Sequence, residues 1–595
     1  MINNRKPLTE VNRTLAKVSL GEEAADLVIQ NGTLVNVLTG ELLKNMDIAV
    51  SEGRIAYVGD VDHTIGSNTK IIDASGKYIS PGLMDAHMHV ESTMLSVTEF
   101  SKAAIVKGTT SIFMDPHEIA NVLGVEGVRL MHNEGQQLPM KVFTTFPSCV
   151  PATDNLEDAG AALEVADIKE GLTWENVVGL GEVMNFPGVV YGDPKMLGEI
   201  EETIKANKTV TGHFPDGSEQ MLQAYIASGV TSCHETVTRE QGLEKLRLGM
   251  YLMIREGSAW HDVKEVIKIV TEDKVNTDHI LLVTDDVYPQ TLTEKGHLNH
   301  VVRRAIEEGV SPIEAIKMAT LNVARYFQKE NDFGSIAPGK VADILILDDL
   351  EKVESSIVIV DGEVIVDNKQ LIHSFPTYSY PEHVKNSVHI HRNLQPSDFQ
   401  LSTASSASVQ VNVIKVIENS ARTEKSSATL QVKDGIIQPN LSEDILLLAC
   451  IDRHHQSGQV SLGFTQGFKL QKGAVASTVA HDSHNLLVMG TNEEDMAFAA
   501  NTLAASGGGM VVVESGKVLA HVPMPIAGLM SDQPLETVVK QVKQLEAAWK
   551  ELGCPIHAPF MTFSLIALPV IPEIRITNRG IADVTTFQLM DTEIK

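Results

Sequence analysis

Cysteine is scarce in this chain of 595 residues, and Cys149, Cys233, Cys450 and Cys554 lie far apart with no CxxC pair among them. That pattern excludes a disulfide framework and a thiolate zinc site, and it suits a reducing compartment. The N-terminal residues lack the apolar segment of a signal peptide. The longest apolar runs, such as 445–451, are far shorter than the roughly 18 residues of a membrane span. We therefore expect a cytoplasmic protein without a membrane partner.

Positive charge is also scarce. The chain has 48 lysines and arginines against 77 aspartates and glutamates, which gives a formal net charge of −29. Such a surface repels nucleic-acid phosphates, so a nucleic-acid partner is not expected. A chain of this length is too long for a single core and should divide into about three or four domains.

The alternation of strands and helices predicts an α/β fold. Between residues 79 and 330, short apolar strands alternate with helical stretches in the rhythm and at the size of a (β/α)8 TIM-type barrel. The alternative, an open doubly wound sheet, would normally carry a glycine-rich nucleotide loop, and the sequence contains none. Hairpin-like strands flank the segment on both sides, which predicts a small β-sandwich domain built from residues 1–78 and 331–380.

The composition changes after residue 380. Segment 381–427 is rich in serine, threonine and asparagine, which favours a linker or surface segment. Strands and helices resume after it, so residues 428–595 are expected to form a separate α+β C-terminal domain.

The most informative motif is the pair His87 and His89 in the run PGLMDAHMHVES. Two imidazoles at positions i and i+2 point the same way only in an extended backbone. Residues 77–80 read as a short strand, which places the pair at a strand end. An isolated HxH pair is more often two unrelated histidines, so its interpretation as half of a metal site depends on ligands further along the chain.

Those ligands follow in order, each just beyond a predicted strand: Glu182, His213, His234 and the pair Asp285–Asp286. Chemistry in an α/β barrel lies at the C-terminal ends of the strands, so these side chains should converge. Imidazole and carboxylate ligands suit Zn²⁺, Fe²⁺ or Mn²⁺. Such a site would hold a water as hydroxide near neutral pH, and a neighbouring carboxylate could take its proton. The sequence therefore predicts hydrolytic attack on a polarised carbon.

This order of ligands resembles the amidohydrolase superfamily, and the run DFGSIAPGKVAD at 332–343 is similar to that superfamily's return into a small β domain. Within the superfamily, the adenine deaminase family is the one that this chain resembles, on the segments 85–92, 115–121, 284–286, 451–455 and 480–485. The resemblance implies hydrolytic deamination of adenine to hypoxanthine and ammonia, a reaction of purine salvage. It also implies a homo-oligomer, expected here as a dimer.

The resemblance further implies a two-metal site. One divalent cation would be bound by His87, His89 and Asp285, a second by His213 and His234, and Glu182 would bridge the two. Mn²⁺ is the expected metal, with Fe²⁺ and Zn²⁺ as alternatives. Asp285 would accept a proton from the attacking hydroxide and help to deliver it to the departing amine.

Substrate contacts are expected from carboxylates just beyond strands and from one C-terminal histidine: Glu91, Glu118, Glu235, Glu256, Asp286 and His481. Glu235 is the first choice for protonating a ring nitrogen, because it directly follows a ligand. Arg255 could orient a carboxylate, although a plain salt bridge is the commoner arrangement. His481 belongs to a dense group of C-terminal histidines, which either cover the barrel mouth, as a lid or an auxiliary metal site, or dock their domain on the barrel.

Two other functions stay open at this point. Another hydrolase of the same superfamily, acting on a cyclic amide or an N-acyl group, would release no ammonia. A non-catalytic scaffold of the same fold should have lost metal ligands, whereas this chain has the whole set.

Overall fold

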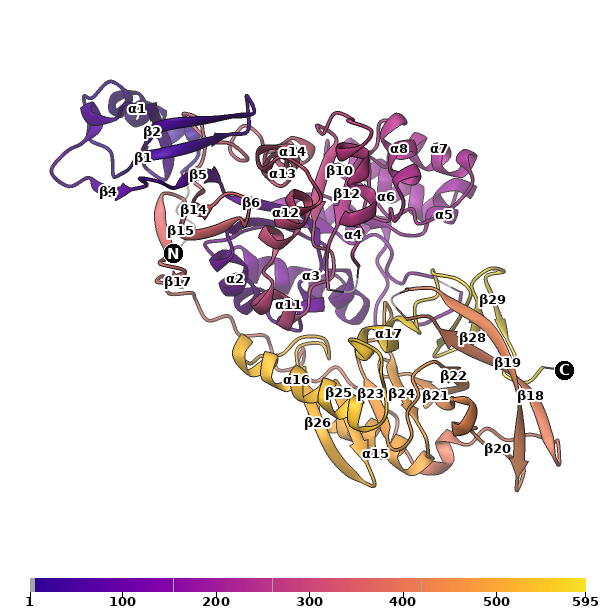
Figure 1. Cartoon of the computed structure of the whole chain (residues 1–595). Coiled ribbons are helices and arrows are strands. Elements are labelled where there is room, and N and C mark those ends of the chain that lie inside the picture. The colour runs from indigo at the N-terminus through magenta and orange to yellow at the C-terminus, as the bar shows by residue number, and fades with distance from the viewer. Residues whose placement is uncertain (1–5, 154, 259, 419, 595) are drawn as a thin grey trace.

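An α/β barrel-type domain lies between a small β domain and a C-terminal domain (Figure 1). The structure is a computed structural model that describes residues 6–594 apart from 154, 259 and 419. Within these residues, no helix is both long enough and apolar enough to cross a membrane. The small β domain, mostly in indigo, lies beside the barrel, and the C-terminal domain, in orange to yellow, lies below it in this view (Figure 1).

The barrel strands are parallel and neighbour one another in chain order. They are β6 (Leu83–Met88), β7 (Thr109–Met114), β8 (Lys141–Phe146), β9 (Val177–Val183), β10 (Thr209–Gly212), β11 (Ser232–Cys233), β12 (Tyr251–Arg255) and β13 (Ile280–Val283). They form a five-stranded sheet, β10-β9-β8-β7-β6, and a three-stranded sheet, β11-β12-β13. The two sheets meet where Met88 forms a parallel bridge with Asp285, just beyond β13. The expected α/β barrel is confirmed at this level.

Helices follow the strands and cover the outside of the barrel. The longer ones are α2 (Val97–Val106), α3 (His117–Gly135), α6 (Pro194–Lys205), α7 (Glu219–Ala227), α8 (Arg239–Arg247) and α12 (Leu298–Glu307). The shorter ones are α4 (Val165–Gly171), α5 (Phe186–Tyr191), α9 (Val263–Val266), α10 (Lys268–Thr271), α11 (Pro289–Glu294), α13 (Pro312–Met318) and α14 (Leu321–Tyr326). Ser96, Ser218 and Thr238 begin α2, α7 and α8 by accepting hydrogen bonds from first-turn backbone N–H groups.

The small β domain is one mixed sheet in the order β17-β16-β15-β14-β5-β1-β2-β3, with β4 beside β1. Its strands are β1 (Leu27–Asn36), β2 (Glu41–Ser51), β3 (Arg54–Gly59), β4 (Lys70–Asp73), β5 (Tyr78–Pro81), β14 (Ile344–Asp349), β15 (Glu354–Val360), β16 (Glu363–Asp367) and β17 (Gln370–Leu371), and α1 (Leu8–Ser19) packs on it. The two flanks of the barrel do combine, but not as two facing sheets. Strand β5 pairs with both β1 and β14, which joins the flanks edge to edge and moves the expected boundary at residue 79 to the end of β5.

The C-terminal domain is built on a nine-stranded sheet in the order β20-β19-β18-β22-β21-β24-β23-β25-β26. Its strands are β18 (Ser408–Val416), β19 (Thr423–Lys433), β20 (Ile436–Ile437), β21 (Ile445–Ile451), β22 (Val460–Gln466), β23 (Ala474–Ser477), β24 (Leu486–Gly490), β25 (Gly509–Glu514) and β26 (Lys517–Pro523). Helices α15 (Glu493–Ser506), α16 (Leu535–Glu551) and α17 (Pro559–Leu565) and a sheet of β27 (Ile574–Thr577), β28 (Gly580–Asp583) and β29 (Gln588–Met590) complete it.

The expected linker at 381–427 is wrong for its second half. Strand β18 and the start of β19 lie inside the C-terminal sheet, where β18 pairs with both β19 and β22. The polar composition concealed a strand in which Val411, Val413 and Ile414 are buried. Burial of these β-branched side chains outweighs the serine and threonine content around them.

Candidate metal centre

His87 and His89 lie at the C-terminal end of β6, as the extended HxH pattern predicts. Both are buried, and their ring centroids are 4.8 Å apart. His89 Nδ1 donates a hydrogen bond to Asp115 O at 2.9 Å, which leaves Nε2 with a lone pair directed into the barrel mouth. His87 Nε2 is buried and has no hydrogen-bond partner among the described residues.

Glu182, the next-to-last residue of β9, is the centre of the cluster. Its Oε2 lies 2.6 Å from His213 Nδ1 and 3.0 Å from His234 Nε2. Its Oε1 lies 3.3 Å from His89 Nε2 and 4.0 Å from His87 Nε2. The two oxygens of one carboxylate therefore face two different pairs of imidazoles.

The backbone of Glu182 is held by Asp115, whose Oδ2 accepts a hydrogen bond from Glu182 N at 2.7 Å. Gly181 makes this contact possible, because a Cβ at that position would lie 2.6 Å from Asp115 Oδ2. A glycine at position 181 therefore lets the Asp115 carboxylate, which lies just beyond β7, approach the backbone of β9.

Asp285 closes the cluster beside the HxH pair. Its Oδ1 lies 3.3 Å from His89 Nε2 and 3.8 Å from His87 Nε2, and its Oδ2 accepts from Arg255 Nη1 at 2.9 Å. Burial opposes the charged form, but the hydrogen bond with His89 and the charge of Arg255 hold the pKa of Asp285 well below its usual range. Asp285 is therefore a carboxylate with one oxygen engaged and the other facing the imidazoles.

The predicted ligands fit a divalent metal centre. The structure brings all of them together: His87, His89, Glu182, His213, His234 and Asp285. The His87 and His234 rings stack at 4.1 Å, so these groups form one continuous cluster. Imidazole nitrogens and carboxylate oxygens are suitable ligands for Mn²⁺, Fe²⁺ or Zn²⁺, and the partnerless Nε2 of His87 is the kind of buried atom that a cation would satisfy.

Sequence reasoning assigned no role to His117, which the structure places in the same cluster. Its Nδ1 lies 3.6 Å from Glu182 Oε1 and 3.6 Å from Asp115 Oδ1, and its ring is 4.6 Å from that of His89. The available signal was its position: His117 follows β7 by three residues, as the other ligands follow their strands. Its Nε2 lies 3.5 Å from Glu118 Oε1, so His117 connects the cluster to the C-terminal histidines.

The expected substrate residues divide into groups. Glu235 forms an ion pair with Arg255, and although burial opposes ionisation, this pair holds the pKa of Glu235 below its usual value. Glu91 behaves in the opposite way, because burial and the nearby charge of Glu118 raise its pKa to about 7, and its Oε2 has no hydrogen-bond partner among the described residues. Asp286 accepts a hydrogen bond from Ser92 Oγ and is buried.

Glu256 is the expected substrate residue that the geometry supports least. Its Oε1 lies 3.1 Å from His261 Nδ1 and 3.6 Å from Arg304 Nε. His261 lies in the segment after β12 and Arg304 lies in α12, so one oxygen of this carboxylate is engaged in an ion network beside the cluster. Its Oε2 is buried without a hydrogen-bond partner among the described residues, and the substrate contact expected from Glu256 stays a prediction.

The C-terminal histidines meet the barrel at Glu118. His481 Nδ1 lies 2.7 Å from Glu118 Oε1, and His484 Nε2 contacts Glu118 Oε2. His484 Nδ1 accepts from Ala480 N at 3.1 Å, which places the ring proton of a neutral His484 on Nε2. That nitrogen donates to Glu118 and has no lone pair for a cation, so this group joins the domains by hydrogen bonds. His481 Nε2 is buried without a partner among the described residues.

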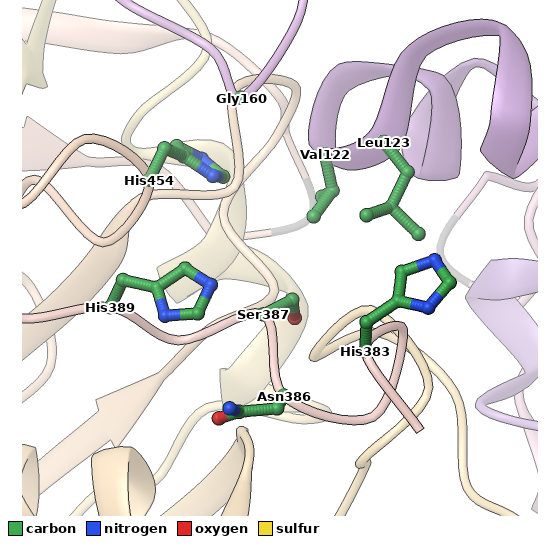
Figure 2. A pocket seen from close by; sticks show the side chains of 8 residues that line it. All are labelled: Val122, Leu123, Gly160, His383, Asn386, Ser387, His389 and His454. Atoms are coloured by element: carbon green, nitrogen blue, oxygen red, sulfur yellow. The ribbon is translucent and has the colours of Figure 1, made fainter. Parts of the chain in front are cut away.

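Of two neighbouring histidines, one hydrogen-bonds to the barrel. His455 Nε2 donates to Ala159 O, in the loop after β8, at 2.8 Å, whereas His454 Nε2 donates to Ser483 O at 2.7 Å within the C-terminal domain. Figure 2 shows His454 beside a cavity of about 310 Å³ between α3 and the C-terminal domain, lined by Val122, Leu123, Gly160, His383, Asn386, Ser387, His389 and His454. None of the predicted ligands lines this cavity, so it is distinct from the cluster.

Comparisons with known proteins agree with this geometry. A family model described as "Amidohydrolase family" matches residues 78–367, and one described as "Adenine deaminase C-terminal domain" matches residues 420–588. The chain is 51% identical over 593 residues to an adenine deaminase of Moorella thermoacetica, which covers 99% of both chains. It is 50% identical over 589 residues to an adenine deaminase of Clostridium botulinum strain Langeland, covering 99% of this chain and 98% of the relative. A third relative, adenine deaminase 3 of Rhizobium meliloti, is 46% identical over 99% of this chain and 100% of its own.

Proposed function

The chain belongs to the adenine deaminases of the amidohydrolase family, and from that membership we infer that it hydrolyses adenine to hypoxanthine and ammonia. The observation that carries this inference is Glu182, a single carboxylate whose two oxygens face opposite pairs of imidazoles. The arrangement sits at the mouth of what we take to be a (β/α)8 barrel, where parallel strands deliver side chains to one point.

In the reaction, water adds its oxygen to C6 of adenine, and the C6–N bond to the amino group breaks. One proton of the water ends on a ring nitrogen, and the other leaves with the amine as ammonia. Two divalent cations bound by the cluster would supply Lewis acidity, which makes a water nucleophilic near neutral pH. We propose Mn²⁺, with Fe²⁺ and Zn²⁺ as alternatives, held by His87, His89, Glu182, His213, His234 and Asp285 in the division expected from the sequence.

Asp285 is the proposed proton carrier. Its Oδ2 is engaged by Arg255, so Oδ1, which faces His87 and His89, is the atom that accepts a proton from water and returns it to the departing amine.

Glu235 and Glu91 are proposed to act on the ring nitrogens in different ways. The ion pair with Arg255 favours the carboxylate form of Glu235, so its proposed role is to accept a hydrogen bond from the substrate and not to donate a proton. Glu91 has a buried oxygen without a partner among the described residues and is the better candidate for the proton donor. Asp286 and Glu118 complete the proposed polar wall, together with His481 from the C-terminal domain.

An ammonia-release assay tests the function. The purified chain is stripped with a chelator, reloaded with Mn²⁺, and assayed with adenine, adenosine, cytosine and guanine. We expect ammonia and hypoxanthine from adenine, two ions per chain by elemental analysis, and loss of both activity and bound Mn²⁺ in Glu182→Gln. Absence of ammonia from adenine with the loaded protein would overturn the proposal, and a product without ammonia release from a cyclic amide would favour the alternative hydrolase. A homodimer stays a prediction, which sedimentation velocity tests.

A further inference from the structure

Lys245 is a buried lysine to which the proposed reaction assigns no role. It belongs to α8 and is 2% exposed. Its Nζ donates hydrogen bonds to Phe214 O at 2.9 Å, to Glu235 O at 2.6 Å and to Thr236 Oγ1 at 2.9 Å. An ammonium group has three N–H donors and costs free energy to bury, so a site with three oxygens around it is one that the fold has to maintain.

The positions of these oxygens connect Lys245 to the metal centre. Phe214 directly follows His213, and Glu235 directly follows His234. One side chain therefore binds the backbone immediately after both histidines that face Glu182 Oε2. A shift of either carbonyl would displace the imidazole on the adjacent residue.

Within the residues that the structure describes, separate hydrogen bonds and not a strand ladder join the two barrel sheets at this place. Strands β10 and β11 lie at the ends of the two barrel sheets, and no ladder pairs them in the described part of the chain. Thr231, the residue before β11, donates a backbone hydrogen bond to Val210 O at 3.0 Å, at the end of the strands away from the histidines. At the ligand end, Cys233 Sγ accepts from Phe214 N at 3.3 Å and lies 3.2 Å from Lys245 Nζ.

We propose that Lys245, together with Cys233, is a positioning residue that holds His213 and His234 at the separation needed to bind the cation on the Glu182 Oε2 side. This inference rests on the proposed function, because it assumes that the cluster binds divalent cations. The residue acts through two carbonyl groups and touches neither substrate nor metal. Its effect should therefore appear in metal retention before it appears in any property of the substrate.

The test compares Lys245→Met and Lys245→Gln with Lys141→Met. Lys141 is a matched control, since it is also buried and begins β8 at the opposite end of the barrel, where its Nζ pairs with Asp343 and lies 3.1 Å from Asp361. Each protein is loaded with Mn²⁺ and challenged with EDTA. Retained Mn²⁺ is measured by elemental analysis, and the Mn²⁺-dependent rise in unfolding temperature by calorimetry.

We expect wild type to hold two ions per chain. Lys245→Met should lose Mn²⁺ about 10- to 100-fold faster and should pass first through one ion per chain. Lys245→Gln keeps two N–H donors and should lose Mn²⁺ at a rate between these two. Lys141→Met should lower the unfolding temperature with and without Mn²⁺ but retain Mn²⁺ as wild type does. The inference is wrong if either Lys245 variant retains Mn²⁺ like wild type, or if Mn²⁺ loss follows unfolding temperature equally in all variants. If Lys245→Met does not fold, Lys245→Gln alone decides. Failure of wild type itself to bind Mn²⁺ would overturn the proposed function.

Discussion

Arg255 Nη1 lies 2.9 Å from Asp285 Oδ2, so the proposed proton carrier is bound to a buried guanidinium that also pairs with Glu235. Arg255 also pairs with a third carboxylate: its Nε donates a hydrogen bond to Asp262 Oδ2 at 2.7 Å. One cation at the end of β12 thus orients two carboxylates that lie just beyond β11 and β13, the strands on either side of β12. Arg255 therefore forms a buried network with several carboxylates, in contrast to the isolated surface salt bridges that are common in proteins.

Substitution of Arg255 by methionine is expected to lower kcat/KM by about 10- to 100-fold. Without the guanidinium, the pKa of Asp285 rises, and since the base must be unprotonated, the acidic limb of the kcat/KM pH profile should move to higher pH. The control is Arg304→Met, which removes from α12 a guanidinium that lies near Glu256. This variant should leave the acidic limb of the profile in place. An unchanged acidic limb in Arg255→Met would contradict the assigned role of Arg255.

His481→Ala separates substrate contact from docking. His481 Nε2 is buried without a partner among the described residues, so its loss should lower kcat/KM by about tenfold or more. His455→Ala is the matched control, because it removes a hydrogen bond of the same domain to the loop after β8. Steady-state kinetics and thermal unfolding are measured for both. Unchanged turnover with a lowered unfolding temperature in His481→Ala would leave His481 as a docking residue only.

Glu157 gives a pH dependence of stability that can be measured. Burial and the nearby charge of Asp482 raise the pKa of Glu157 from its ordinary 4.5 to about 8. The folded state therefore binds more protons than the unfolded state between these pH values, and the stabilisation is lost as the pH rises through about 8. Glu157→Gln should match wild type at pH 5 and be more stable at pH 9, on the order of 3–5 kcal/mol. Calorimetry at pH 5, 7 and 9 tests this, and a difference independent of pH would refute it.

The cysteines should be unreactive in the folded protein. All of them are buried, and burial raises the pKa of Cys149 to about 12 and that of Cys554 to about 11. Since the thiolate is the reactive form, Ellman's reagent at pH 7.5 should modify fewer than about one thiol per native chain. In guanidinium chloride all four should react. Rapid modification of several thiols in the native protein would show that these sites open readily.

The sequence by itself determined the α/β barrel-type domain and the convergence of the predicted metal ligands. An HxH pair at a strand end and acidic or imidazole residues at the ends of four later strands suffice, because parallel strands of a barrel end at one mouth and bring those positions together. The convergence of His87, Glu182 and Asp285 could therefore be predicted from local patterns alone. His117 follows the same rule, because it lies three residues beyond the end of β7.

Only the tertiary structure decided what surrounds the ligands. Arg255 could be named from the sequence, but its two carboxylate partners come from different strands, and Lys245 reaches two loops that no local pattern connects. The contact between Glu118 and His484 joins residues 366 positions apart. The linker expected at 381–427 became strand β18 for the same reason. Burial against distant chain segments sets these outcomes, and the free energy of burial depends on neighbours that short stretches of sequence do not specify.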